Sequence, residues 1–209
     1  MTNILILDSA ATGDASVSRK LTDSAAHTIR RRDPSARIVR RDIGADPIPH
    51  LNERTLPAIR AGLVESEEAA AALALSDALI GELQAADLIV IGAPMYNFGM
   101  PSTLKSWFDH VLRAGLTFSY SEAGPEGLLK GKKTIVVESR GGLYSEGPAA
   151  AMDHQEPYLR TLLGFMGLDD VTFVRAEKLA FGPEAAAAAV ADAIERIEEL
   201  TEAELALAA

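Results

Sequence analysis

The feature that most constrains the fold is a strand that runs directly into a glycine- and proline-rich loop and then into a helix. Leu88–Ile91 is an uninterrupted apolar run rich in β-branched residues, which is typical of a strand covered on both faces in a parallel sheet. Beyond the loop Gly92–Pro101, apolar residues recur at spacings of three and four from Leu104 to Leu112, as in an amphipathic helix. This unit predicts an α/β fold.

The same alternation of strand and helix recurs along the whole chain. Strands are predicted at Ile4–Leu7, Arg37–Arg40, Leu88–Ile91, Thr134–Val137 and Val171–Val174, and helices at about 18–32, 66–85, 101–112, 158–165 and beyond 183. Every connection is long enough for a right-handed crossover. We therefore expect a doubly wound, five-stranded parallel sheet with helices on both faces, formed as one domain by residues 1–209. Prolines lead us to expect irregular structure over 43–64, and we expect another irregular stretch over 114–130.

Composition narrows the classes of partner. The net charge of -10 argues against binding to nucleic acid or to an anionic membrane, because both need a basic surface. The chain has no cysteine, which excludes disulfides and thiolate metal sites. We see no signal peptide and no apolar run of the ~20 residues that span a bilayer, so we expect a cytoplasmic protein. The four histidines lack metal-ligand spacing, and we predict no metal site.

Three loops leave the carboxyl ends of predicted strands and should gather on one rim of the sheet, beside the point where strand order reverses. The first, residues 9–18, suits a phosphate, because Ser16 and Ser18 offer hydroxyls and the following helix begins there. It is neither a Walker A motif nor a dinucleotide fingerprint. An ordinary serine-capped helix explains this loop equally well.

The second loop, Met95–Phe98, has the composition of a platform for a flat ring. Met95, Tyr96 and Phe98 would supply apolar surface, and the Asn97 amide could hydrogen-bond to a ring edge. The competing interpretation is that these side chains simply close the end of the sheet, since aromatic residues more often pack than bind cofactors.

The third loop, Ser139–Gly142, ends in consecutive glycines. Without a Cβ, the backbone N–H groups of Gly141 and Gly142 can approach a ligand closely and stabilise negative charge on a reduced ring. Ser139 is a weak candidate for a nucleophile, because the stretch around Glu138-Ser139-Arg140-Gly141 lacks the first glycine of G-x-S-x-G.

Met95–Phe98 together with Ser139–Gly142, at this spacing, resembles the FMN-dependent NADH-azoreductase family of flavodoxin-like quinone reductases. Supporting stretches lie at 42–49, 75–77, 114–120, 124–128 and 157–167, so the resemblance covers essentially the whole chain. It implies a flavodoxin-like fold and a homodimer with FMN sites near the interface. It also implies ping-pong transfer of two electrons from NADH to quinones or aromatic azo compounds.

The resemblance also implies which residues bind FMN. They are Ser9, Ser16, Val17 and Ser18 around the phosphate, and Met95, Tyr96, Asn97, Phe98, Ser139, Arg140, Gly141 and Gly142 around the isoalloxazine. Ser9 is the weaker member, because Ala10-Ala11-Thr12 stands where many relatives have a second serine. Phe118, Tyr120 and Phe165 are candidates for an acceptor pocket, or equally for core or interface.

No catalytic side chain is expected, because a flavin carries the hydride chemistry itself. Two other functions fit the same fold. A flavodoxin-type electron carrier would share the FMN site, and a non-catalytic binding domain would lack FMN.

Overall fold

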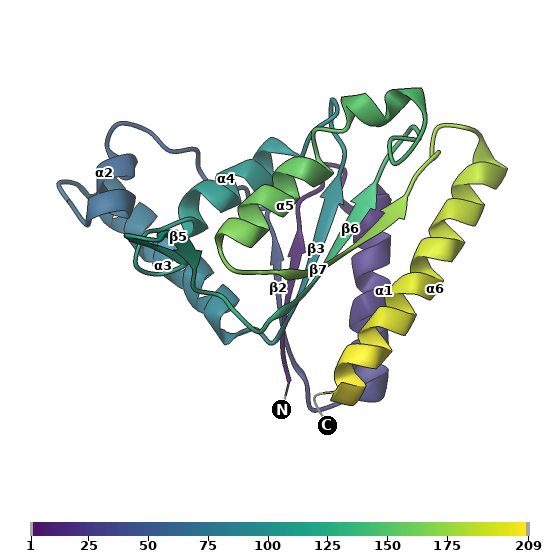
Figure 1. Cartoon of the computed structure of the whole chain (residues 1–209), viewed down its shortest axis with the longest axis horizontal. Coiled ribbons are helices and arrows are strands. Elements are labelled where there is room, and N and C mark those ends of the chain that lie inside the picture. Colours follow the sequence, from purple (N-terminus) through teal and green to yellow (C-terminus); the bar gives the residue numbers. More distant parts are fainter. Residues whose placement is uncertain (1, 208–209) are drawn as a thin grey trace.

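The computed structural model describes residues 2–207, which form a five-stranded sheet in the order β2-β1-β3-β6-β7 (Figure 1). The strands are β1 (Asn3–Asp8), β2 (Arg37–Asp42), β3 (Leu88–Pro94), β6 (Lys133–Ser139) and β7 (Asp170–Ala176). All four neighbouring pairs are parallel. The predicted doubly wound α/β fold with five parallel strands is confirmed.

Helices cover both faces of the sheet, and each face has its own apolar core (Figure 1). On one face lie α1 (Val17–Arg32) and α6 (Pro183–Leu207); on the other lie α3 (Glu67–Ala85), α4 (Ser102–Val111) and α5 (Glu156–Phe165). Because successive side chains of a strand point to opposite faces, Val90 packs with the α1 and α6 side, whereas Ile89 and Ile91 pack with the other. Burial on both sides explains why β3 is apolar throughout.

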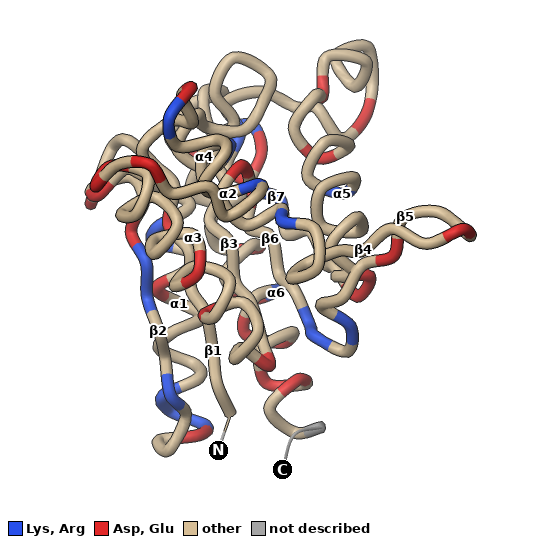
Figure 2. Tube along the Cα trace, turned by 90° about the vertical axis from the view of Figure 1, so that its left-hand side faces the viewer, with Lys and Arg blue, Asp and Glu red and all other residues tan. Residues whose placement is uncertain are grey.

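The two stretches that we expected to be irregular contain regular elements. Residues 43–64 include α2 (Thr55–Ala61), in which Pro57 lies in the first turn, where its missing N–H breaks no helical hydrogen bond. Residues 114–130 form an antiparallel hairpin of β4 (Phe118–Ser121) and β5 (Gly124–Gly127), which projects from the body of the molecule in Figure 2. Two short 3-10 turns, η1 (Gly13–Ala15) and η2 (Pro148–Met152), complete the elements. Within residues 2–207, no helix combines the length and apolar content that crossing a membrane requires.

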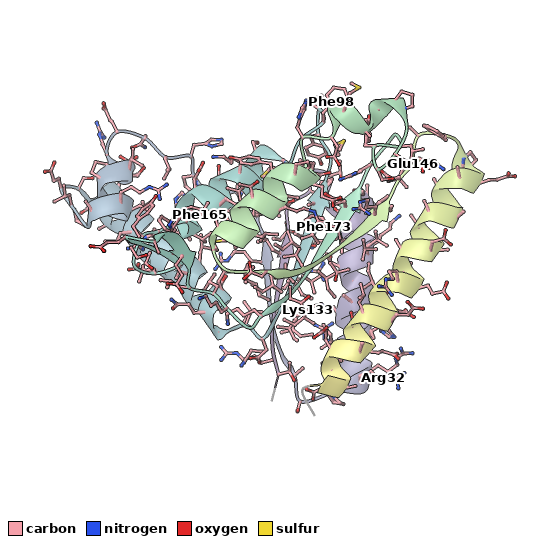
Figure 3. The ribbon with its side chains drawn as sticks, viewed as in Figure 1. Arg32, Phe98, Lys133, Glu146, Phe165 and Phe173 are labelled. Carbon is pink, nitrogen blue, oxygen red and sulfur yellow. The ribbon has the colours of Figure 1, made fainter. Side chains whose placement is uncertain are left out.

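Strand order reverses at β1, whose neighbours are β2 and β3. The loops that follow β1, β3 and β6 therefore lie on the same rim, at the carboxyl ends of the strands, where open α/β sheets bind ligands. Figure 3 shows Phe98 at this rim, and Lys133 and Arg32 toward the opposite end of the molecule.

Candidate functional site

The first loop delivers two buried hydroxyls to the start of α1. Ser16 caps the helix, since its Oγ accepts a hydrogen bond from the N–H of Arg19 at 3.2 Å. The Oγ atoms of Ser16 and Ser18 lie 3.0 Å apart, and both residues are buried. The first N–H groups of a helix, here those of Val17 and Ser18, have no partner inside it. Together with the helix dipole, these donors make the end of α1 suitable for a phosphate.

The Ser9 hydroxyl is bonded within the protein. It is fully buried, and its hydroxyl donates to the carbonyl of Gly92 at 2.6 Å. Its own carbonyl accepts a hydrogen bond from the Thr103 hydroxyl at 2.8 Å. The single hydroxyl hydrogen of Ser9 is thus used within the sheet. Ser9 thus supports the first loop from within the sheet, and its contact with a phosphate stays a prediction.

The second loop is a tight two-residue turn. Tyr96 and Gly99 exchange two backbone hydrogen bonds, of 2.9 and 3.1 Å. Between them, Asn97 and Phe98 both have positive φ, 49° and 69°, as a type I′ turn requires. An aromatic residue rarely adopts this conformation, which costs about 1 kcal/mol or more. The backbone N–H of His154 holds the turn by donating to the Phe98 carbonyl at 3.0 Å.

This turn presents its side chains to the outside. Asn97 and Phe98 are exposed, and Met95 and Tyr96 are half-buried. The Phe98 and Tyr144 rings form a T-shaped pair, with centroids 6.0 Å apart. A strained turn that exposes an aromatic ring is poor packing for a sheet end, which favours the interpretation as a platform for a ligand.

Direct hydrogen bonds join the three loops. The Tyr96 hydroxyl accepts a bond from the N–H of Ala11 in the first loop at 3.1 Å. The N–H of Met95 donates to the carbonyl of Ser139 in the third loop at 2.9 Å. The structure therefore brings together the predicted phosphate and ring segments. Ala11 and Thr103 were not predicted for this site, because their contribution comes from backbone position and long-range pairing.

In the third loop, the two glycines leave their amide groups available. Their carbonyls accept hydrogen bonds from Ala180 and Lys178, but within residues 2–207 the N–H groups of Gly141 and Gly142 donate to no other group. A Cβ on Gly142 would lie only 2.9 Å from the Tyr144 ring. The Tyr144 ring thus packs closely against Gly142, and binding of a ligand by the two N–H groups stays a prediction.

Arg140, the residue before the two glycines, is held inside the protein. Its side chain is fully buried, its N–H donates to the carbonyl of Ala176, and its carbonyl accepts from Leu179. The side chain lies behind the loop, within a cluster of carboxylates, and direct contact of Arg140 with a flavin stays a prediction.

The three aromatic residues proposed for an acceptor pocket cluster at the β4–β5 hairpin, away from the rim. Phe118 is buried against Phe165, with ring centroids 4.7 Å apart, and Tyr120 is 71% exposed. Figure 3 shows Phe165 well apart from Phe98. Among residues 2–207, no group of three or more His, Asp or Glu side chains is arranged to hold a metal ion.

The donors at the rim match the parts of FMN. The helix end and the Ser16–Ser18 pair suit the phosphate, the Phe98 turn offers a surface for a flat ring, and the glycine N–H groups suit the carbonyl edge of that ring. All three lie around the strand-order reversal, as a mononucleotide site in this type of sheet requires.

Comparisons with known proteins agree with this assignment. A family profile described as flavodoxin-like fold matches residues 2–201. The chain is 58% identical over 202 residues to an FMN-dependent NADH:quinone oxidoreductase of Hyphomonas neptunium, covering 97% of both chains. It is 52% identical to a protein of the same name from Ralstonia nicotianae, covering 90% of this chain and 91% of that one.

Solved structures give the same result. An azoreductase from Bacillus anthracis superposes with a TM-score of 0.87 at 29% identity, covering 96% of this chain and 99% of that one. The fold, the resemblance at the paired loops and the identity to curated relatives all agree. The chain belongs to the family of FMN-dependent NADH:quinone oxidoreductases and azoreductases, with a flavodoxin-like fold.

Proposed function

We propose that this chain binds FMN as a single domain and carries two electrons from NADH to quinones by a ping-pong mechanism, with aromatic azo compounds as further acceptors. The observation that carries this proposal is the junction of the three loops, where Tyr96 bonds to Ala11 and Met95 bonds to Ser139. The named relatives support the cofactor and the donor, since they are described as FMN-dependent NADH:quinone oxidoreductases.

Each part of the cofactor has a proposed set of partners. Ser16, Val17 and Ser18 hold the phosphate at the end of α1, and Met95–Phe98 with Ser139–Gly142 hold the isoalloxazine. Within these sets, Ser9 and Arg140 act by supporting the loops, for the reasons given above. Bound flavin supplies the hydride-accepting and hydride-donating centre.

The side chains contribute orientation and charge stabilisation. The free N–H groups of Gly141 and Gly142 are fixed by the hydrogen bonds of their own carbonyls, so they can stabilise negative charge without reorganising. The Phe98 turn is fixed by His154 and by its mutual hydrogen bonds. No acid or base from the protein is needed, and we assign no catalytic side chain.

We further propose that the chain works as a homodimer, whose second copy completes the acceptor pocket. Large apolar side chains lie exposed on the two excursions that flank the α3 and α5 side: Leu56, Leu63, Val64, Tyr120 and Leu128. Tyr120 is 71% exposed, which is unusual for a side chain assigned to a pocket. Contact with a second copy would bury these side chains and place Phe118, Tyr120 and Phe165 near a rim site.

Steady-state kinetics test the proposed reaction. NADH oxidation should depend on added benzoquinone, and double-reciprocal plots at several quinone concentrations should give parallel lines, as a ping-pong mechanism requires. A flavodoxin-type carrier would bind FMN but show no NADH oxidation with or without quinone. Sedimentation analysis should give twice the mass of the chain; a monomer that is fully active would contradict the dimeric site.

A further inference from the structure

Behind the third loop lies a buried cluster of charged side chains that the proposed reaction does not use. At its centre, the fully buried guanidinium of Arg140 lies 2.6 Å from a carboxylate oxygen of Glu138. It also lies 3.1 Å from Asp153 and 3.3 Å from Glu177. Glu156 is a fourth carboxylate, 3.8 Å away. Glu138 lies in β6 and Arg140 just after it, Asp153 and Glu156 lie before and at the start of α5, and Glu177 follows β7.

Hydrogen bonds join the Arg140 cluster to the end of β3 and to the residues that follow the third loop. Gln155 accepts a bond from Arg140 Nε at 3.2 Å, and its amide donates to the carbonyl of Ala93, just before the Phe98 turn, at 2.9 Å. Glu177 accepts bonds from the N–H groups of Tyr144 and Ser145, at 2.8 and 3.0 Å. Removing Arg140 would leave these buried partners unpaired and would release the segments that they hold.

The charges of the cluster do not balance if every group is ionised. The carboxylates are Glu138, Asp153, Glu156 and Glu177, and the guanidiniums are those of Arg140, Arg160 and Arg175. Arg175 and Arg160 both bind Glu156 most closely, within 2.7 Å. The neighbouring strand β3 brings no charged side chain next to Glu138, because its residues there are Gly92, Ala93 and Pro94. Arg175 also lies 3.8 Å from Glu138. The cluster therefore holds one carboxylate more than it holds guanidinium groups.

Among the carboxylates of the cluster, Glu138 is the one that most readily takes up a proton. It is fully buried, and one of its oxygens, Oε1, has no hydrogen-bond partner among the described residues. Burial raises the pKa of Glu138 to about 8, against the opposing effect of Arg140. Partners have the opposite effect on its neighbours: hydrogen bonds from Arg175 and Ser145 hold the pKa values of Glu156 and Glu177 below their usual range, despite burial. A proton on Glu138 makes the cluster neutral overall.

We propose that Glu138 and Arg140 are positioning residues for the flavin: Arg140 fixes the two ring-binding loops from behind, and protonated Glu138 keeps the cluster neutral beneath the bound ring. This inference rests on the proposed function, because it takes these loops to be the FMN site. It assigns Arg140 a role through Gln155 and Glu177, in place of direct contact with the cofactor. It also makes Glu138 a group whose ionisation weakens flavin binding.

Titration of the apoprotein with FMN, followed by quenching of flavin fluorescence, tests both parts. The useful window runs from pH ~7 to ~9, because the FMN phosphate, with a second pKa near 6, is already a dianion there. For the unmodified protein, affinity should fall roughly 10-fold as pH rises through this window. Glu138→Gln should abolish that fall. Arg140→Met should weaken binding at least ~10-fold at every pH, and Arg140→Lys should restore part of it.

Matched controls come from Arg41 and Glu82, a partly buried ion pair between β2 and α3 that touches none of the ring loops. Arg41→Met and Glu82→Gln should cost stability and leave FMN affinity and its pH dependence unchanged. If Glu138→Gln keeps the pH dependence of the unmodified protein, or folded Arg140→Met binds FMN normally, the inference is wrong. If Arg140→Met does not fold, Glu138→Gln still decides. Absence of FMN binding by the unmodified protein would instead overturn the proposed function itself.

Discussion

Replacing Gly44 by alanine should disturb the phosphate loop from outside the site. Gly44 follows β2, and its N–H approaches the carbonyl of Asp8 at 3.3 Å and Asp42 Oδ1 at 3.1 Å. A Cβ at this position would lie 2.0 Å from the carbonyl oxygen of Ala10 and 2.8 Å from its carbon. Ordinary contacts begin at 3.4 Å, so the first loop would have to move by more than ~1 Å, because backbone cannot rotate away as a side chain can.

The expected cost is about 1–3 kcal/mol of stability. For a chain of this size, each kcal/mol lowers the melting temperature by about 2–4 °C. Displacement of Ala10 also moves Ala11 away from the Tyr96 hydroxyl, which it contacts at 3.1 Å. We therefore expect Gly44→Ala to weaken FMN binding at least ~10-fold, which corresponds to ~1.4 kcal/mol.

The assay is thermal melting of the apoprotein together with FMN titration. Gly81→Ala is the matched control, because Gly81 lies in α3 and a Cβ there meets nothing within 4 Å. Alanine in a helix should raise stability by about 0.5–1 kcal/mol and leave FMN affinity unchanged. If Gly44→Ala melts and binds FMN like the unmodified chain, the close packing of Gly44 on the phosphate loop does not govern the site.

Three further substitutions test the third loop, the second loop and the β4–β5 hairpin one at a time. The variant Gly141→Val should fold normally, because a Cβ there lies 3.7 Å from its nearest neighbour. It should weaken FMN binding at least ~10-fold, because the larger side chain blocks the ring. Unchanged FMN affinity would show that the third loop is not part of the site. Tyr96→Phe loses the acceptor for Ala11, worth about 1 kcal/mol or roughly fivefold in FMN affinity; identical titration curves would contradict this. The variant Gly127→Ala would put a Cβ 2.1 Å from the backbone of Gly167. Its melting temperature and its rate of quinone reduction should therefore fall. Normal values of both would refute a structural role for the β4–β5 hairpin.

The pH dependence of stability provides another test of the buried cluster. The native pKa of Glu138, about 8, lies above that of an unfolded glutamate, ordinarily 4.5. Between these values the native state holds a proton that the unfolded state has lost, so the stabilising contribution falls as pH rises and is lost at about pH 8. Urea unfolding should show Glu138→Gln gaining stability relative to the unmodified chain between pH ~5 and ~8. A constant difference across this range would contradict a buried, protonated Glu138.

The sequence predicts the sheet well because each of its strands carries a local signal. Ile4–Leu7, Leu88–Ile91 and Thr134–Val137 are apolar runs bounded by polar or glycine-rich loops, and burial on both faces demands such runs. The phosphate segment has a similar local signal, the serine cap at Ser16. These features depend on neighbours along the chain, which a single sequence reveals.

Features that depend on distant partners were missed. The hairpin Phe118–Gly127 is held by packing of Gly127 against Gly167, a contact that no local pattern indicates. Ser9 looks like a phosphate ligand, yet its hydroxyl bonds to Gly92, 83 residues away in sequence. Arg140 stands beside two glycines and looks like a ring contact, yet its side chain turns into the buried carboxylates.

The resemblance to the azoreductase family supplied what the residues alone left open, namely the identity of the ring and its electron donor. The alternatives of a serine-capped helix and an aromatic sheet end were physically sound for each loop in isolation. The three loops lie together at the strand-order reversal and are joined by direct hydrogen bonds. This arrangement favours a single binding site formed by all three loops.

The most direct test of the central claim is the anaerobic visible spectrum of the protein loaded with FMN. A flavin band that moves on binding, bleaches when NADH is added and returns with benzoquinone is the result that the three-loop site predicts. A protein that leaves the FMN spectrum and fluorescence unchanged, even with FMN in excess, would contradict it and would favour a non-catalytic domain of the same fold.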